Sequence, residues 1–294
     1  MSLPTRWRRV ILAVPAVWLA LFFLVPMVLV AGLSVSTARL GSPPFEPVWV
    51  MVEGWPRLQA SLANYQLLLD DPIYWDAVVG SVTLAGFATL GCLAIGFPLA
   101  YAIARAPAHH RVLLVMLVMV PFWTSFLIRT YAWVALLQTE GLINGALLAL
   151  GLVREPLSLI ATDGAVLIGV VYTYLPFMVL PLYAALEKFD WQLLEAAADL
   201  GATPTRAFWS VTLPLAVPGL LAGSLLVFIP VLGEYVVPAL LGGADQVLIG
   251  GVVWTEFFGN RDWPLAAALA IVLLALVLVP ILWLQTLRRD GVVR

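Results

Sequence analysis

Long apolar runs separated by short polar segments dominate the chain. A hydrocarbon core about 30 Å thick requires about 20 mostly apolar residues in a helix, and six stretches reach that length. Prolines inside several of them, such as Pro98 and Pro176, are tolerated when neighbouring helices satisfy the freed carbonyl groups, which favours a packed bundle. The pattern predicts an all-α membrane protein with six transmembrane helices, at Val10–Leu33, Ala77–Ala104, Val112–Leu137, Val166–Leu186, Leu215–Leu241 and Leu265–Leu287.

A hydrophilic stretch separates the first apolar run from the rest. Residues 34–76 contain Pro, Trp and acidic residues and predict an outer loop, and residues 77–287 predict a core domain with the other five spans. The first span, 10–33, follows a basic segment at 1–9 and could be mistaken for a cleaved secretory signal. Because its apolar run of about 24 residues is longer than a usual signal core, we interpret it as an uncleaved span.

A seventh apolar run, Gly141–Leu152, is too short to cross a bilayer as a helix and predicts a helix at the interface or outside the bundle. The distribution of basic residues tests this interpretation, because cytoplasmic loops carry an excess of Lys and Arg. Six spans place ten basic residues on one side and four on the other, whereas a seventh crossing places seven on each side. The bias therefore predicts six spans, with the N-terminus (1–9) and the C-terminal tail (288–294) in the cytoplasm.

The composition agrees with a chain that uses lipid as its solvent. Apolar residues make up 63% of the chain and charged residues 11%, against about 45–50% and about 25% in soluble domains. The net charge of −2 argues against a nucleic-acid binder. A single cysteine, Cys92, forms no internal disulfide and no metal-ligand set, so neither a metal site nor a cofactor is predicted. The single lysine, Lys188, is not in a phosphate-binding loop, so a nucleotide site must lie on another chain.

The loop at 190–214 carries the most specific local signals. Asp190 can cap a short helix that ends at Gly201, and Thr203 can cap a second helix with Pro204 at its first position. This chemistry predicts a helix–turn–helix elbow on the cytoplasmic face. Composition alone also allows an ordinary amphipathic loop that lies on the lipid headgroups.

The spacing within this loop resembles the EAA loop of ABC importer permeases. The matching positions are Glu195, Ala196, Ala197, Gly201, Val211, Leu213 and Pro214, and Val211 departs mildly from the usual Ile. The resemblance implies that the loop is a coupling element that docks into a groove of a separate ATPase. The residues that it implies for this contact are Glu195, Ala196, Ala197, Asp199, Gly201, Ala202, Thr203, Pro204, Arg206 and Phe208.

Four other segments resemble the spermidine/putrescine permeases: 121–133, 141–144, 240–243 and 260–264. The resemblance implies a type I ABC importer (MetI-like) permease in the bacterial inner membrane, and a small cationic solute, most simply a polyamine. It also implies an ATP-binding subunit dimer, a periplasmic solute-binding protein and a second permease subunit, with a heterodimer favoured. Nucleic acid is not an expected partner. Permeases of this subfamily also serve other small solutes, such as amino-acid-like compounds or opines, so that alternative stays open.

Candidate pathway residues are an acid and several aromatic side chains within the spans. An acidic residue inside a span normally faces protein or water, so Glu234 is a candidate, with Tyr235 beside it. Its place near the outer end of a span also allows an interfacial position. Trp254 and Trp123 are further candidates, since aromatic faces attract ammonium groups. For Arg129, within the third span, we expect a structural ion pair with an acid.

Two other classes of function are alternatives to a transport subunit. A stand-alone secondary transporter or channel should carry ion-coupling acids near mid-membrane, where Glu234 is the one candidate and is off-centre. An intramembrane enzyme should show a Ser/His dyad, a metal-ligand cluster or paired acids within the spans, and the sequence offers none of these. The sequence therefore predicts a transport subunit and not an enzyme.

Overall fold

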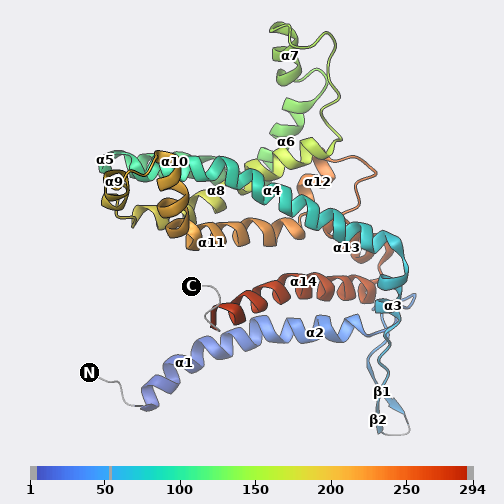
Figure 1. The fold of residues 1–294 in the computed structure, drawn as a ribbon. Helices are drawn as coiled ribbons and strands as arrows, with labels where there is room; N and C mark the ends of the chain where they lie inside the picture. The colour runs from blue at the N-terminus through green and yellow to red at the C-terminus, as the bar shows by residue number, and fades with distance from the viewer. Residues whose placement is uncertain (1–4, 53–54, 290–294) are drawn as a thin grey trace. The chain divides into compact units, whose positions relative to one another are not determined.

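The computed structural model describes residues 5–52 and 55–289, so the predicted cytoplasmic ends at 1–9 and 288–294 lie partly outside the described residues. Helices dominate the described chain, as predicted (Figure 1). The chain divides into two compact units. One contains the residues up to Ala77 together with those from Ile249 onward, and the other contains Val78–Leu248.

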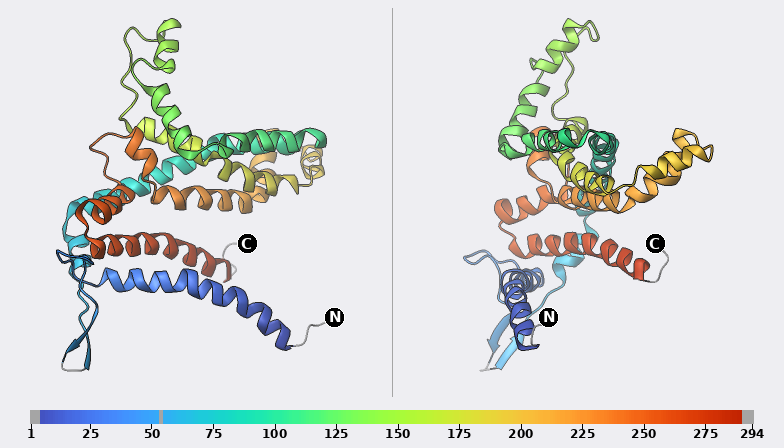
Figure 2. Two further views of the ribbon diagram at one scale, coloured as in Figure 1. Left: turned by 180° about the vertical axis from the view of Figure 1, so that it is seen from behind. Right: turned by 90° about the vertical axis from the view of Figure 1, so that its left-hand side faces the viewer.

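The first unit is built around two long apolar helices that lie side by side (Figures 1 and 2). The N-terminal one consists of α1 (Thr5–Leu19), a π-helical segment η1 (Ala20–Leu24) and α2 (Val25–Ser34). The other is α14 (Trp263–Arg289), which follows α13 (Ile249–Trp254) and a π-helical segment η3 (Thr255–Asn260). The predicted first and sixth spans therefore exist as helices, and they pack against each other within one unit.

The predicted outer loop has more structure than its sequence indicated. It contains an antiparallel strand pair, β1 (Trp49–Val52) and β2 (Trp55–Leu58), and a helix, α3 (Ala63–Asp70). Polar contacts fasten α3 to the end of α2: Asn64 donates to the carbonyl oxygens of Ser34 and Ser36 at 2.9 Å, and the Tyr65 hydroxyl donates to Ser34 Oγ at 2.8 Å. The loop is thus tied to the first span through side-chain hydrogen bonds.

The second unit is a helical bundle with α8 (Asp163–Glu187) as its most buried helix. Around it run α4 (Pro72–Arg105), whose first turn belongs to the other unit, α5 (Ala108–Trp123) and α11 (Leu213–Leu232). The closest packing is between α8 and α11, where Gly219 and Gly223 leave no side chain between the helices. A Cβ atom at Gly219 would lie 2.6 Å from the Ala185 Cβ, so only glycine permits this approach, as at other small-xxx-small helix contacts in membranes.

The predicted third span, Val112–Leu137, is not one helix. The structure ends α5 at Trp123 and begins α6 (Phe126–Leu137) after two non-helical residues, Thr124 and Ser125. The Thr124 hydroxyl donates to the Pro121 carbonyl oxygen at 2.7 Å, which offers this last turn a local alternative to helical hydrogen bonding. Figure 1 shows that α5 and α6 run in different directions. The short helix predicted from Gly141–Leu152 is present as α7 (Leu142–Ala149).

The predicted fifth span, Leu215–Leu241, is interrupted as well. It divides into α11 and α12 (Val236–Leu241), with a bend at residues 233–235. By length and apolar character, five helical segments among the described residues could cross a membrane, and two shorter apolar helices accompany them. The five are Ile11–Ser34, Pro72–Arg105, Phe126–Ala149, Asp163–Glu187 and Pro204–Leu232, and the shorter ones are Ala108–Trp123 and Trp263–Leu278.

Candidate functional site

The loop between α8 and α11 folds into the elbow that its sequence predicts. Helix α9 (Gln192–Asp199) begins where Asp190 Oδ1 accepts a hydrogen bond of 3.0 Å from the Gln192 amide. Helix α10 (Pro204–Ala207) has Pro204 at its first position, and the Thr203 hydroxyl accepts from the Arg206 amide at 3.4 Å. A π-helical segment, η2 (Phe208–Thr212), then leads into α11. Both predicted helices and the Thr203 cap are confirmed. Asp190 lies one position before the N-cap residue of α9, Trp191, and its side chain accepts from the first helical amide.

The turn of the elbow depends on Gly201. This residue has a φ of +83°, and its amide donates to the Ala198 carbonyl oxygen at 2.8 Å. The next amide, that of Ala202, reaches back to the Ala197 carbonyl oxygen at 2.9 Å. These two bonds close the end of α9 in the manner of a Schellman motif, in which the left-handed position favours glycine. The predicted left-handed turn at Gly201 is confirmed.

The outer surface of the elbow is open. Most of the predicted ATPase contacts are exposed, and the apolar side chain of Leu200, at the tip, is 89% exposed. Ala197 and Ala202 are half-buried, so they line the inner side of the turn. The exposed members of the predicted contact are Glu195, Ala196, Asp199, Gly201, Thr203, Pro204 and Arg206. A surface free for a partner therefore exists on this loop.

Aromatic contacts join the inner side of the elbow to α4. The ring of Phe208 meets the ring of Phe97 edge-on, with 5.5 Å between centroids, and Trp191 meets Tyr101 in the same way at 5.6 Å. The Arg105 guanidinium lies 5.2 Å from the centre of the Trp191 ring. Phe208, which the resemblance assigned to the ATPase contact, is thus half-buried against α4. In this structure it connects the elbow to the bundle.

Glu234 is buried, with 8% of its surface exposed, at the bend between α11 and α12. One carboxylate oxygen accepts hydrogen bonds from the amides of Val236 at 3.0 Å and Val237 at 3.2 Å. The other accepts a short hydrogen bond from the hydroxyl of Tyr174 on α8. These contacts make Glu234 the cap of α12, because a carboxylate at a helix N-terminus satisfies amides that have no partner within the helix.

The other three pathway candidates have different surroundings. Tyr235 is its neighbour in the chain and is half-buried. The side chain of Trp123, at the end of α5, is 69% exposed. Trp254 belongs to the other compact unit, where its ring lies 4.2 Å from that of Phe258. A shared pathway role for these four residues remains a prediction.

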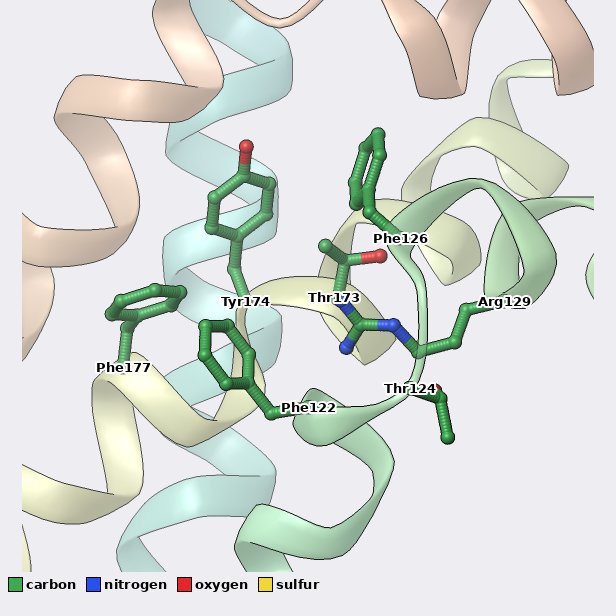
Figure 3. A pocket seen from close by; sticks show the side chains of 7 residues that line it. All are labelled: Phe122, Thr124, Phe126, Arg129, Thr173, Tyr174 and Phe177. Atoms are coloured by element: carbon green, nitrogen blue, oxygen red, sulfur yellow. The ribbon is translucent and has the colours of Figure 1, made fainter.

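A cavity of about 370 Å³ lies where α5, α6 and α8 meet. Figure 3 shows the Arg129 guanidinium extending from the first turn of α6 into the middle of its lining side chains. The ion pair expected for Arg129 is absent from the described residues, where its Nε and Nη1 are buried without a hydrogen-bond partner. The Arg129 guanidinium carbon lies 5.4 Å from the centre of the Phe122 ring, which is a cation–π contact. The cavity is lined by Phe122, Thr124, Phe126, Arg129, Thr173, Tyr174 and Phe177.

Sequence reasoning did not select Tyr174, Thr173 or Phe177 as site residues. They come from α8, which is about 50 residues along the chain from the α5–α6 link, so their proximity depends on tertiary packing. The one signal in the sequence was Arg129, a charged residue inside an apolar span. A search for the polar residues of the neighbouring spans would have included Thr173.

Comparisons with known proteins agree with the resemblance found in the sequence. A curated relative from Salmonella typhimurium, the spermidine/putrescine transport system permease protein PotB, is 40% identical over 92% of this chain and 89% of its own. A bacterial ABC transporter involved in alginate import has a subunit with a TM-score of 0.70 at 18% identity, over 97% of this chain and 96% of that one. A chain of the methionine ABC transporter MetNI has a TM-score of 0.55 at 19% identity, over 76% of this chain and 100% of that one.

These two solved structures confirm the predicted fold of a type I ABC importer permease. A family model described as "binding-protein-dependent transport system inner membrane component" matches residues 5–289. The match covers both compact units. The chain therefore belongs to the family of inner-membrane components of binding-protein-dependent transport systems.

Proposed function

We propose that this chain is the permease subunit of an ABC importer for polyamines such as spermidine and putrescine. The observation that carries the proposal is the 40% identity to a polyamine permease over 92% of the chain. The identity extends over nearly all of the relative as well, so it is not a match to a shared coupling loop alone. A polyamine is a flexible polycation, and the outer segments of this chain carry more acidic than basic residues, which favours the approach of cations.

The elbow of α9 and α10 is the proposed coupling element. A separate ATPase subunit grips its exposed face, which includes Glu195, Leu200 and Arg206. Because Phe208 and Trp191 join the inner face to α4, a displacement of the elbow is transmitted to α4 as well as to α8 and α11. ATP binding on the partner then favours one of two arrangements of the bundle, which is how a ligand on one chain changes access on another.

The remaining partners follow from the same proposal. ATP hydrolysis takes place on the ATP-binding subunit dimer, a solute-binding protein delivers the substrate on the periplasmic side, and a second homologous permease completes the pore. Both termini lie in the cytoplasm, an arrangement supported by the ten basic residues that six spans place on that side. The elbow then faces the cytoplasm too, where an ATPase can reach it.

The experiment that tests coupling reverses one charge on the elbow. Glu195→Lys, in the permease co-expressed with its cognate ATP-binding subunit, should abolish co-purification of that subunit, because the reversed charge lies on the exposed contact face. Glu155→Lys makes the same charge change on an exposed residue outside the elbow and should leave co-purification intact. Retention of the ATPase by the Glu195→Lys protein would refute the coupling role.

The substrate is tested separately with the complete transporter. Cells that lack other polyamine uptake should accumulate labelled spermidine or putrescine when all subunits and the binding protein are present. A transporter that assembles and hydrolyses ATP, yet accumulates neither compound, would refute the polyamine substrate and leave the coupling role standing.

A further inference from the structure

The strongest unexplained feature of the structure is a buried cation without a partner. Arg129 has 7% of its surface exposed, and its Nε and Nη1 make no hydrogen bond with the described residues. A guanidinium always carries its charge in a protein. Since burial of an uncompensated charge is strongly unfavourable, this arrangement calls for an anion at the guanidinium.

The described residues do not supply that anion. Glu234 is the one acidic residue among their buried side chains, and it makes no ion pair with Arg129. Its oxygens accept from the Tyr174 hydroxyl and from the amides of Val236 and Val237. The contact with the Phe122 ring, 5.4 Å from the guanidinium carbon, orients Arg129 but offers no acceptor atom for its N–H groups.

The cavity around Arg129 has the size and lining of a small-molecule site. Its volume of about 370 Å³ lies at the low end of the range for small-molecule pockets, about 300–1,000 Å³, and it is more open than enclosed. The rings of Phe122, Phe126 and Phe177 form its apolar part, and Thr124 and Thr173 bring hydroxyl-bearing side chains (Figure 3). No carboxylate belongs to the lining, so a diamine finds no counter-ion here and meets the positive charge of Arg129.

We propose that this cavity binds a small organic oxyanion, with its carboxylate or phosphonate group on the Arg129 guanidinium and its hydrocarbon part against the phenylalanine rings. The fork of guanidinium donors matches the geometry of such groups. The proposal goes beyond polyamine transport and does not rest on it, because a polyamine has no anionic group. It extends the ligands of this permease to compounds that carry an oxyanion on a short hydrocarbon chain.

Binding to the purified full-length chain in lipid nanodiscs tests the proposal. The probes are 4-aminobutyrate, 3-aminopropylphosphonate and 1,4-diaminobutane, measured by isothermal titration calorimetry. We expect either or both oxyanion probes to bind and the diamine not to compete with them. A preference between the two probes identifies the carboxylate or the phosphonate as the better ligand. Arg129→Gln should weaken oxyanion binding by about 10- to 100-fold, the loss typical of a charged hydrogen bond.

Arg154→Gln removes the same charge from an exposed loop residue and should change nothing. The comparison of probes on the wild-type chain does not depend on how any variant folds. The proposal is overturned if the wild-type chain binds neither oxyanion probe, or if the Arg129→Gln protein binds them as tightly as the wild type. Co-purification of the second permease subunit is measured in parallel with the co-expressed complex. If the wild type binds no probe and Arg129→Gln loses that subunit, the partner of Arg129 is an acid of the second subunit and the proposal is overturned.

Discussion

Glu234 can be changed in two ways that separate its hydrogen bonds from its charge. The carboxylate accepts from the amides of Val236 and Val237 and from the Tyr174 hydroxyl. In Glu234→Gln the amide oxygen can still accept from the two backbone amides, and the amide nitrogen can donate to the Tyr174 oxygen. In Glu234→Ala all three contacts are lost. The two variants therefore share the loss of charge and differ in the capping of α12.

The expected loss in the free energy of unfolding follows from these contacts. Loss of an N-cap costs about 0.5–2 kcal/mol, and a partly buried hydroxyl left without its acceptor adds about 1 kcal/mol or more. Glu234→Ala should therefore lower the free energy of unfolding by about 2–3 kcal/mol. Glu234→Gln, which can keep the same hydrogen bonds, should lower it by less than about 1 kcal/mol. A difference of about 1.4 kcal/mol between them corresponds to a tenfold change in the unfolding equilibrium.

The assay is thermal and denaturant unfolding of the purified chain in one detergent, followed by transport in the reconstituted complex. Equal destabilisation by Ala and Gln would refute the capping argument. If Gln keeps stability but lowers the uptake of a diamine more than that of a neutral solute, the charge of Glu234 serves the pathway. If Gln changes neither quantity, Glu234 acts as a cap alone and is removed from the pathway.

Two further substitutions test the packing of the second unit. Gly219→Ala should lower the free energy of unfolding by about 1–3 kcal/mol in thermal unfolding, because the new Cβ would lie 2.6 Å from the Ala185 Cβ. The control is Gly86→Ala, in a helix with open space around that residue, which should be neutral or stabilising. Equal effects of the two substitutions would contradict the close approach of α8 and α11. Asn144→Ala should speed proteolysis of the loop at 150–162, because the buried Asn144 side chain makes two hydrogen bonds of 2.9 Å with the backbone of Leu157. An unchanged rate of cleavage would contradict this anchoring role.

The elbow could be predicted from the sequence because its structure is encoded locally. Asp190, Gly201, Thr203 and Pro204 each act on a neighbour within a few residues, so their roles require no knowledge of the rest of the fold. The helical spans could be predicted from their length and apolar character for the same reason, since each helix makes its backbone hydrogen bonds within its own segment.

The cavity could not be predicted in this way. The break at Thr124 and Ser125 lies within an otherwise continuous apolar run, and periodicity alone does not reveal it. The ion pair expected for Arg129 is absent among the described residues for a related reason: the charge was visible in the sequence, but its surroundings depend on α8. Glu234 was singled out as an acid within a span that is a pathway candidate, and the structure shows it buried. Its capping contacts could not be predicted because they depend on the bend at 233–235.

The glycine contact between α8 and α11 has a mechanical consequence for the elbow that connects them. At Gly219 and Gly223 the two backbones touch almost directly, so neither helix can slide along the other without a collision. Both ends of the elbow are thus attached to two helices that are locked together at this contact. If the proposed coupling holds, a displacement of α9 or α10 would move α8 and α11 as a pair and would not shift one along the other.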